Sequence, residues 1–489
     1  MASAAEQEKG GRPATREGSR PGTRGRADTG EGPFVAVAEP STPATARREG
    51  SGDGRVTAAA ESGTVGVAEG GLPDLEEEKR PTTAADLEDS EEEDPDAPPP
   101  PPPPVISRLY CIPRDYRRAV EVQVNLDNLK VTTKLIGKEN FNEGKYITCA
   151  KATTGPHWYC VPYDAIKIME VDVENYQVRE IPPSFSKHGA KYTACVASPN
   201  YHGRMYAAPC RAQKILELDP AAGTFREVGP AVGSKKYAKW WAIAAGATGR
   251  LYAVPYDARR VLEIDVNRGG KAREIGPDLG TQPGKYMCVD EAPNGNLYAA
   301  PFNAERVLEI NASGQVRLVG PNFGPTPRKY SCIIRAPNKL LYAPPLYADR
   351  VLEINCARGE TTEIGPVLGC GEAKYGCACV APINEKVYCA PLEARKVLEI
   401  NPPDHEVMEI GMDLGGECNE KYGAIAAAPG EHPKVYAAPR NAHFILEIDP
   451  VRQYVKEVGS DLGRCQRKFS CIIPGVCRRD EEVKSMLEA

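Results

Sequence analysis

The sequence lacks several features that would assign a protein to a class at once. No apolar run approaches the roughly 18 residues needed to span a bilayer, and no apolar signal segment follows the N-terminal Met. Glu6, Glu8 and Glu17 interrupt the N-terminal arginines, which argues against a transit peptide. The 16 Cys are too sparse for a disulfide scaffold. We therefore expect reduced thiols and a cytoplasmic protein.

The first 104 residues differ sharply from the rest. They hold 22 acidic and 11 basic residues, whereas residues 105–489 hold 45 acidic and 50 basic ones. A segment this poor in apolar residues cannot offset its ordering entropy, so we predict a disordered tail over 1–104. It contains an acidic stretch at 86–96 and a polyproline run at 98–104, which suits a spacer or a ligand for proline-binding modules. Ser90 is a candidate phosphorylation site.

The rest of the chain is an eightfold repeat. In every unit a Tyr is followed by a Pro three residues later and by a Glu eleven residues later. Short strands separated by Gly, Pro and Asn turns account for each unit of 44 to 49 residues, which is typical of a propeller blade. The repeated glutamates are Glu121, Glu170, Glu217, Glu263, Glu309, Glu353, Glu399 and Glu447.

The two ends of the repeat are complementary. The first unit lacks the Lys-Tyr strand that begins the other units, and an isolated copy of this strand lies at Lys468–Pro474. We predict that this C-terminal strand pairs into the N-terminal blade, because closure removes two exposed sheet edges. The predicted fold class is all-β: an eight-bladed β-propeller of four-stranded antiparallel blades over 105–474, followed by a C-terminal extension at 475–489.

The unit consists of Lys-Tyr, Leu-Tyr-Ala-x-Pro, Val-Leu-Glu-Ile-Asp and Ile-Gly-Pro. Over residues 108–474 it resembles the repeats of the β-propeller superfamily, and in particular a repeat of protist and algal propellers with no assigned function. This resemblance implies the fold but no activity. The Gly-His and Trp-Asp pair of WD40 repeats and the Gly-Gly doublet of kelch repeats are missing, as is the tryptophan docking motif of quinone-cofactor propellers.

The repeated Glu lies inside a predicted strand whose two faces both meet other blades, so its carboxylate needs a partner. The Lys of the Lys-Tyr strand occurs as often as the Glu, and a basic residue three positions before the Glu occurs in seven units. We interpret these residues as ion pairs and Tyr hydrogen bonds that lock each blade. The alternative is a charged ring that lines the channel. A catalytic centre is normally unique, which argues against catalysis by an eightfold residue.

Most cysteines occupy repeat positions that hold Ala or Val in other units, which predicts small buried side chains. Cys377 and Cys379 form the one close pair, and no two Cys-x-x-Cys motifs occur, so we predict no structural zinc. The six His share no repeat position. We therefore assign no catalytic residues, no metal and no cofactor.

The positions that the repeat leaves free lie between the second and third strands. Residues four, five and seven after each Tyr vary, as in Arg114, Asp115 and Arg117. These turns should share one face with the segments that join the blades, and propellers bind ligands on such a face. Trp240-Trp241 is the one break in the first-strand pattern, beside Lys235, Lys236 and Lys239, and is either a packing variant or a feature of the channel mouth. The candidate binding residues are Tyr163, Asp164, Arg211, Trp240, Trp241, Tyr256, Asp257, Arg259, Phe302, Asn303, Tyr347, Asp349, Glu393, Arg395, Arg440 and Asn441.

We expect a non-catalytic protein–protein interaction platform, a monomeric propeller that binds unidentified protein partners on this face. The alternative is an enzyme or a small-ligand-binding propeller, including one for carbohydrate, with its site at the central channel. An enzyme should place unique acids or bases at one blade. A further interpretation is that the variable turns are simple solvated loops without a binding role. The net charge of +5 over residues 105–489 is too weak to predict nucleic acid binding.

Overall fold

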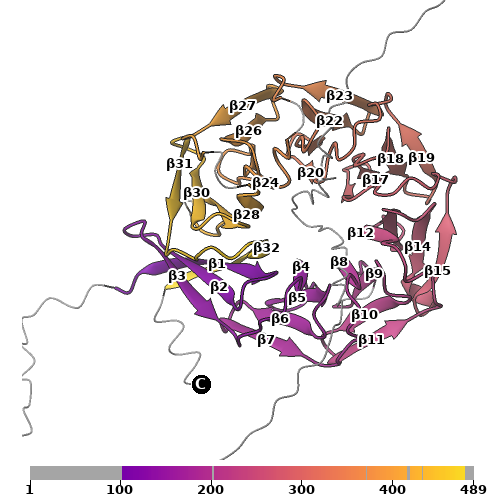
Figure 1. Cartoon of the computed structure of the whole chain (residues 1–489), viewed down its shortest axis with the longest axis horizontal. Coiled ribbons are helices and arrows are strands. Elements are labelled where there is room, and N and C mark those ends of the chain that lie inside the picture. The colour runs from indigo at the N-terminus through magenta and orange to yellow at the C-terminus, as the bar shows by residue number, and fades with distance from the viewer. Residues whose placement is uncertain (1–101, 201–202, 370–371, 416–418, 432, 480–489) are drawn as a thin grey trace, which may run out of the picture.

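The computed structural model describes residues 102–200, 203–369, 372–415, 419–431 and 433–479. The predicted acidic stretch, Ser90 and nearly all of the predicted tail lie outside these residues. Eight four-stranded antiparallel sheets surround a central channel, which confirms the predicted eight-bladed propeller (Figure 1).

In each blade the first strand lies beside the channel and the fourth lies at the rim (Figure 1). Blade 1 combines β1 (Val105–Pro113), β2 (Ala119–Asn125) and β3 (Val131–Ile136) with β32 (Phe469–Arg479). The strands of blades 2 to 4 are β4 (Tyr146–Lys151), β5 (His157–Pro162), β6 (Ile168–Asp172), β7 (Gln177–Ile181), β8 (Tyr192–Ala197), β9 (Met205–Pro209), β10 (Ile215–Asp219), β11 (Thr224–Val228), β12 (Trp240–Ala245), β13 (Leu251–Pro255), β14 (Val261–Asp265) and β15 (Lys271–Ile275). The strands of blades 5 to 8 are β16 (Asp290–Glu291), β17 (Leu297–Ala299), β18 (Val307–Ile310), β19 (Val316–Val319), β20 (Ile334–Arg335), β21 (Leu341–Ala343), β22 (Val351–Asn355), β23 (Glu360–Ile364), β24 (Cys379–Val380), β25 (Val387–Cys389), β26 (Val397–Asn401), β27 (Glu406–Ile410), β28 (Tyr422–Ala427), β29 (Val435–Pro439), β30 (Ile445–Asp449) and β31 (Tyr454–Val458).

The ring closes as predicted, with β32 antiparallel to β1. Tyr110 faces Ile473, and the pairing continues until Val105 meets Arg479. The strand therefore extends beyond the predicted propeller end at residue 474. The extension has a packing reason, because Val476 contacts the core between blades 1 and 2.

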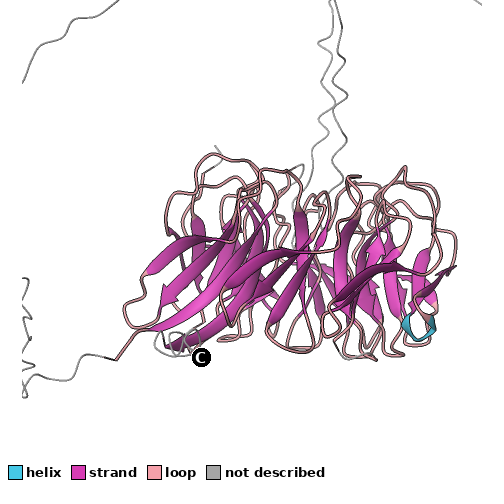
Figure 2. Ribbon diagram, turned by 90° about the horizontal axis from the view of Figure 1, so that it is seen from below, coloured by secondary structure: helices cyan, strands magenta, loops and turns pink. Residues whose placement is uncertain are grey.

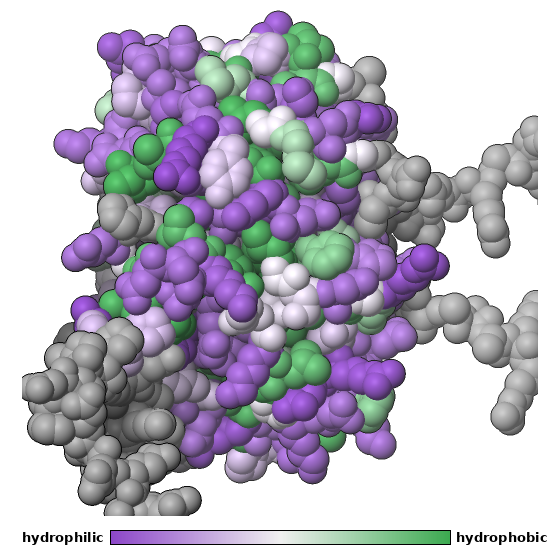
Figure 3. All heavy atoms as spheres, turned by 90° about the vertical axis from the view of Figure 1, so that its left-hand side faces the viewer, coloured by the Kyte–Doolittle hydropathy of each residue, from purple (hydrophilic) through white to green (hydrophobic). Residues whose placement is uncertain are grey.

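The core lies between neighbouring blades. Every residue of β10 and β13 is buried, because the second and third strands of a blade meet another sheet on both faces. The fourth strands are partly exposed, and the rim in Figure 3 is mostly hydrophilic with scattered apolar residues. The short 3₁₀ helix η1 (Val266–Arg268) links β14 to β15, and no helix in the described ranges is long and apolar enough to cross a membrane.

The first strands are the least regular part of the blades. In blades 2, 3, 4 and 8 a register shift follows the Tyr-type residue, as between Tyr146 and Cys149. At the same place in blades 5 to 7 the ladder is interrupted further, so that β16, β20 and β24 contain two residues each rather than the longer strands predicted. An extra, unpaired residue of this kind bends the strand where it lines the channel.

Candidate functional site

One side of the ring carries the longer loops, as Figure 2 shows. We call this side the loop face. It consists of the turns between second and third strands and of the segments that join consecutive blades. Backbone hydrogen bonds hold the two sets together, as predicted: Asp164 N donates to Gly144 O at 3.0 Å and Asn303 N to Gly284 O at 2.9 Å. We call the opposite side the base.

Neighbouring blades are fastened together at the loop face by two repeated contacts. The carboxylate of Asp257 accepts a hydrogen bond from Gly284 N, 2.9 Å away in the segment leading to the next blade. Asp164, Asn303 and Asn441 make the same contact, whereas Glu393 binds a backbone N–H of its own blade. In the reverse direction, the repeated lysines donate to backbone carbonyls, as Lys239 Nζ does to Ala212 O at 2.8 Å. These predicted binding residues therefore stabilise the face itself.

The prediction that the Lys of the Lys-Tyr strand pairs with the repeated Glu is wrong. Glu263 instead contacts Arg250 at 2.8 Å and Arg273 at 2.7 Å, and Glu447 contacts Lys434 at 2.8 Å. These cations come from the turn before the second strand and from the fourth strand. The Lys begins the first strand at the loop face, while the Glu side chain is bound from the base, so the two lie at opposite ends of the blade.

The other expected contacts of the repeated glutamates are present in a modified form. In blades 2, 3, 7 and 8 the repeated Tyr donates a hydrogen bond to the Glu, for example from Tyr436 Oη to Glu447 at 2.9 Å. The basic residue three positions before the Glu binds a carbonyl instead, as Arg118 Nε does to Gly137 O at 2.9 Å. Two strands separate the Glu-bearing strand from the channel, so these carboxylates do not line it.

The loop-face end of the channel is filled by side chains, which we call the plug. Its members are the residues four positions after each repeated Tyr, together with Trp241. Tyr163, Phe302 and Leu392 belong to one buried cluster although they come from blades 2, 5 and 7. The plug therefore spans the channel, and Tyr163, Trp241, Phe302 and Arg440, which were predicted as binding residues, are buried within it.

The two tryptophans have separate roles. Trp240 occupies the Tyr position of blade 4, and its indole Nε1 donates to Arg260 O at 2.9 Å, as the Tyr286 hydroxyl does to Arg306 O in blade 5. It is therefore a packing variant. Trp241 points into the plug, where its ring centroid lies 4.7 Å from that of Tyr256.

The remaining predicted residues lie nearer the surface. Arg259 and Arg395 are exposed and pair with acids of the segment that follows in their own blades, Arg395 with Asp413 at 2.7 Å. Arg211, Tyr256 and Tyr347 are half-buried, and Asp349 is exposed. The structure thus divides the predicted set into residues that fasten the loop face, residues of the plug and a few accessible side chains.

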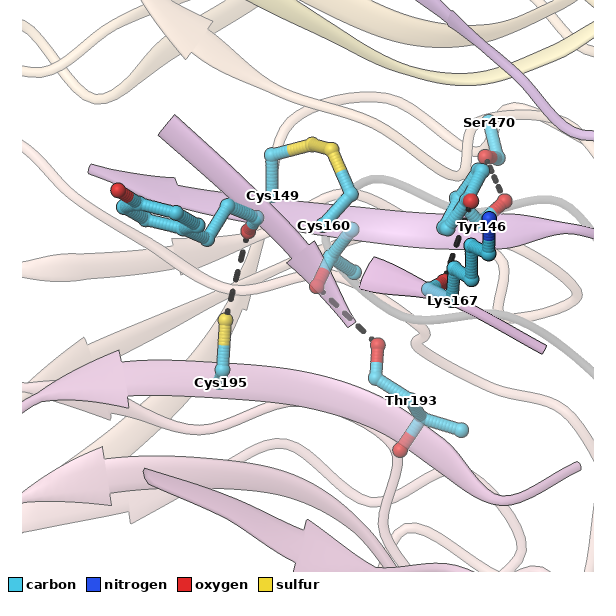
Figure 4. Close-up of a disulfide and its surroundings, with 9 residues drawn as sticks. Tyr146, Cys149, Cys160, Lys167, Thr193, Cys195 and Ser470 are labelled. Carbon is cyan, nitrogen blue, oxygen red and sulfur yellow. Dashed lines mark hydrogen bonds between the residues drawn. A yellow bond between two sulfur atoms is a disulfide. The ribbon is translucent and has the colours of Figure 1, made fainter. Parts of the chain in front are cut away.

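Beyond the plug, the first strands enclose a channel cavity of about 290 Å³ lined by thiols and small apolar groups. Burial raises the pKa of Cys195 and of Cys332 to about 12, so these thiols are protonated near neutral pH. The prediction that all cysteines are reduced is wrong at one place. Cys149 and Cys160 face each other across β4 and β5 with Cα atoms 4.2 Å apart, and they form a disulfide (Figure 4).

A second cavity, of about 660 Å³, lies on the loop face between blades 2 and 3. We call it the basic groove. Its cationic side chains outnumber the one carboxylate among its lining residues, Glu227. The cations are those of Lys191, Arg211, Lys214, Arg226 and Lys235. Only Arg211 was among the predicted binding residues. The basic residues around His188 and Lys235, in two consecutive segments between blades, were the signal for this groove in the sequence.

Two cations of the groove have constrained side chains. Lys191 Nζ donates to His188 O at 2.8 Å, and burial lowers the pKa of Lys191 to about 8, although Asp164 opposes this. Arg226 Nε pairs with Glu217 at 3.0 Å. Lys214 and Lys235 are exposed and form no ion pair with the described residues, so they contribute uncompensated positive charge to the groove.

Comparison with protein families and with curated proteins finds no match for this chain. Among solved structures, apo AztD from Citrobacter koseri is 11% identical, with a TM-score of 0.51 over 76% of this chain and 99% of that one. A catalytically inactive virginiamycin B lyase from Staphylococcus aureus with quinupristin is 16% identical, with a TM-score of 0.47 over 60% and 92%. The dihydro-heme d1 dehydrogenase NirN is 10% identical, with a TM-score of 0.47 over 76% and 75%. Such likenesses show the fold alone.

Proposed function

We propose that the protein is a non-catalytic protein–protein interaction platform whose basic groove binds an acidic segment of the partner. The observation that carries this proposal is the charge of the groove, where five cations face one carboxylate. Complementary charge steers association and selects between partners. A partner segment with several Asp, Glu or phosphorylated side chains therefore fits this groove best.

The groove also offers an anchor for an apolar side chain. Phe185 and Ala231 line it beside the cations, and the Phe185 ring packs edge-on against Tyr192 with centroids 6.5 Å apart. Arg211 Nε is buried and has no hydrogen-bond acceptor among the described residues. A carboxylate of the partner next to an apolar residue would satisfy both features, since interface anchors combine apolar contact with paired charge.

The alternative, a small ligand in the central channel, is supported by the cavity of about 290 Å³. Its walls are apolar and thiol groups, which suit an apolar ligand better than a reaction that needs an acid and a base. The carbohydrate version of this alternative needs aromatic side chains exposed on the loop face. Tyr163 and Phe302 are buried, which leaves Tyr256 and Tyr347. The resemblance to protist and algal repeats adds no functional assignment.

The test uses the full chain with the eight acids of residues 86–96 replaced by Asn or Gln, so that the chain cannot compete with the probe. The probe is a fluorescent peptide with the natural sequence of residues 86–96, unphosphorylated or phosphorylated at Ser90. We expect saturable binding by fluorescence anisotropy, and at least about tenfold weaker binding by the Lys214→Glu/Lys235→Glu variant.

The matched control is Lys130→Glu, which reverses an exposed lysine in the β2–β3 turn at the base. This substitution changes the net charge without altering the groove, so the affinity should stay within about twofold of the parent chain. The proposal is wrong if neither peptide binds. It is also wrong if binding depends equally on Lys130 and on the groove lysines, because that result describes a general effect of charge.

A further inference from the structure

Two arginines lie buried side by side in the plug. Arg114 follows β1 and Arg440 follows β29, at the same repeat position in blades that are neighbours because the ring closes. Each is 1% exposed. Lys468 connects them through the backbone: its N–H donates to Arg440 O and its carbonyl accepts from Arg114 N, both at 2.8 Å. In the other blades this position holds aromatic or apolar side chains or a Cys.

The two guanidiniums have unequal partners. Arg440 Nε pairs with Glu420 at 2.9 Å, and Gly423 leaves room for this side chain, since a Cβ there would lie 3.3 Å from Arg440 Cδ. Arg114 Nε and Nη1 are buried without a hydrogen-bond acceptor in any described residue. The nearby carboxylate of Asp115 is held elsewhere, by Gly144 N at 2.5 Å and by Arg467 Nε at 3.1 Å.

A buried guanidinium with two unsatisfied donor atoms is costly, and deprotonation does not relieve the cost because arginine keeps its proton at physiological pH. Burial lowers the pKa of Arg114, and the neighbouring positive charge of Arg440 lowers it further. Two adjacent guanidiniums present the forked donor pattern that binds carboxylate or phosphate oxygens. A small oxyanion would therefore neutralise the excess charge and satisfy the two free donors of Arg114.

We propose that Arg114 and Arg440 form an enclosed binding site for one small oxyanion, a carboxylate or a phosphate, at the centre of the loop face. This site is separate from the basic groove and does not depend on the proposed platform function. The aromatic members of the plug lie in other blades: Tyr163 and Trp241 belong to one buried cluster, and the Tyr256 ring packs against Trp241. The plug covers the guanidiniums, so the ligand must be small and enclosed rather than held on the surface.

The test measures anion binding to the full chain by calorimetry and by thermal unfolding, in chloride buffer of constant ionic strength. Inorganic phosphate and acetate are added in separate arms, which distinguishes the two oxyanion types. We expect one saturable site per chain for at least one of them and an unfolding midpoint raised by that anion. Arg114→Leu should abolish both effects, and Leu fits the position because Leu346 and Leu392 occupy it in blades 6 and 7.

Two control variants separate this site from other effects. Arg117→Leu removes an exposed arginine of the same turn, and Lys214→Glu/Lys235→Glu alters the basic groove; both should keep the anion site. In chloride alone, Arg114→Leu should raise the unfolding midpoint, because it replaces a buried unpaired charge with an apolar side chain. If that variant does not fold, Arg114→Lys, which keeps the charge but loses the fork, should bind at least about tenfold more weakly.

The proposal is overturned if neither phosphate nor acetate shows a saturable site on the natural chain. It is equally overturned if Arg114→Leu, or in its place Arg114→Lys, binds as the natural chain does. A lower midpoint of Arg114→Leu in chloride would also contradict it, since that result means the guanidinium is already paired within the protein.

Discussion

The base and the loop face of this propeller differ in whether their buried charged side chains have partners of opposite charge. At the base, each of the eight repeated glutamates lies within ion-pair distance of a basic side chain, and Glu447 has Lys434 at 2.8 Å and Lys456 at 3.2 Å. At the loop face, Nε and Nη1 of Arg114 are buried without an acceptor among the described residues. An Arg or Lys partner recurs in seven blades and Glu353 of blade 6 has His405, whereas the unbalanced charges occur in one or two blades.

This difference separates structure from recognition. A contact needed to hold each blade in place recurs around the ring, so its charges are compensated within the protein. A contact with another molecule is needed once, and its charge is compensated only when that molecule is bound. The unbalanced positions of the loop face, in the plug and in the basic groove, are therefore where ligands should be sought.

The largest effect is expected from breaking the balance at the base. Glu447→Gln removes a buried carboxylate and leaves Lys434 facing a neutral amide, so we expect the free energy of unfolding to fall by about 3 kcal/mol. Chemical denaturation of the full chain measures this change. Glu360→Gln, at an exposed acid of β23, is the control and should change the value by less than about 0.5 kcal/mol.

The same glutamate also gives the base a dependence on acid pH. Burial would raise the pKa of Glu447, but hydrogen bonds from Lys434 and Tyr436 outweigh burial and lower it. The carboxylate therefore stabilises the fold above the unfolded pKa of roughly 4.3, and this stabilisation is lost as the pH falls through the lower, folded pKa. The stability of Glu447→Gln should therefore fall less steeply with decreasing pH than that of the natural chain. Identical pH dependence in the two proteins would contradict the view that paired charges stabilise the base.

The disulfide between Cys149 and Cys160 makes blade 2 differ from the other blades. The disulfide joins residues separated by 11 positions, so the Cys149→Ala/Cys160→Ala variant should lose about 2 kcal/mol of stability. Thermal unfolding with and without dithiothreitol checks this. The reductant should lower the midpoint of the natural chain and leave that of the variant unchanged. Equal midpoints for the natural chain in both buffers would mean that blade 2 is no more constrained than blade 3.

The fold could be predicted from the sequence because the motif of one blade recurs eight times. The constant spacing of Tyr and Glu fixes the blade, and the stray strand at Lys468–Pro474 predicts closure. The partner of each repeated Glu could not be predicted in the same way. The Lys and the Glu recur equally often, but antiparallel strand order places them at opposite ends of the blade, and the cation that binds Glu263 is Arg273 of the fourth strand. Frequency in a repeat does not identify contact.

The candidate sites were predicted only in outline. The variable turns were recognised, yet strand alternation does not extend into a turn, so the sequence did not separate Tyr163 and Arg440, which point into the plug, from Asp164, which caps a backbone N–H. The basic groove was missed because its lysines come from separate segments of the chain. Lys191 precedes β8 and Lys235 lies between β11 and β12, so these two residues are 44 positions apart and meet only when the strands of blade 3 fold.

A smaller effect is expected at alkaline pH on the loop face. Burial lowers the pKa of Lys191 and of Lys329 to about 8, against a usual value of roughly 10.4. Between these values the unfolded chain binds more protons, so the stability should rise as the pH increases from about 8 to 9.5, by about 1 kcal/mol for each lysine. Denaturation across this range should show a smaller rise for Lys329→Met. A fall in stability between pH 8 and 9.5 would contradict the lowered pKa values of these two lysines. The ion pairs on the base side of the ring should not obscure the result, because they are expected to lose stability only at acid pH.

The smallest effect tests whether charge at the loop-face surface contributes to folding at all. Asp278 pairs with Arg259, and Asp413 pairs with Arg395 at 2.7 Å, but all four side chains are exposed to water. Exposed pairs are screened and must immobilise long side chains, so Asp278→Asn and Asp413→Asn should leave the denaturation midpoint unchanged at low and at high salt. A clear, salt-sensitive loss would contradict the division made above, because paired charge at the loop face would then stabilise the blades as it does at the base.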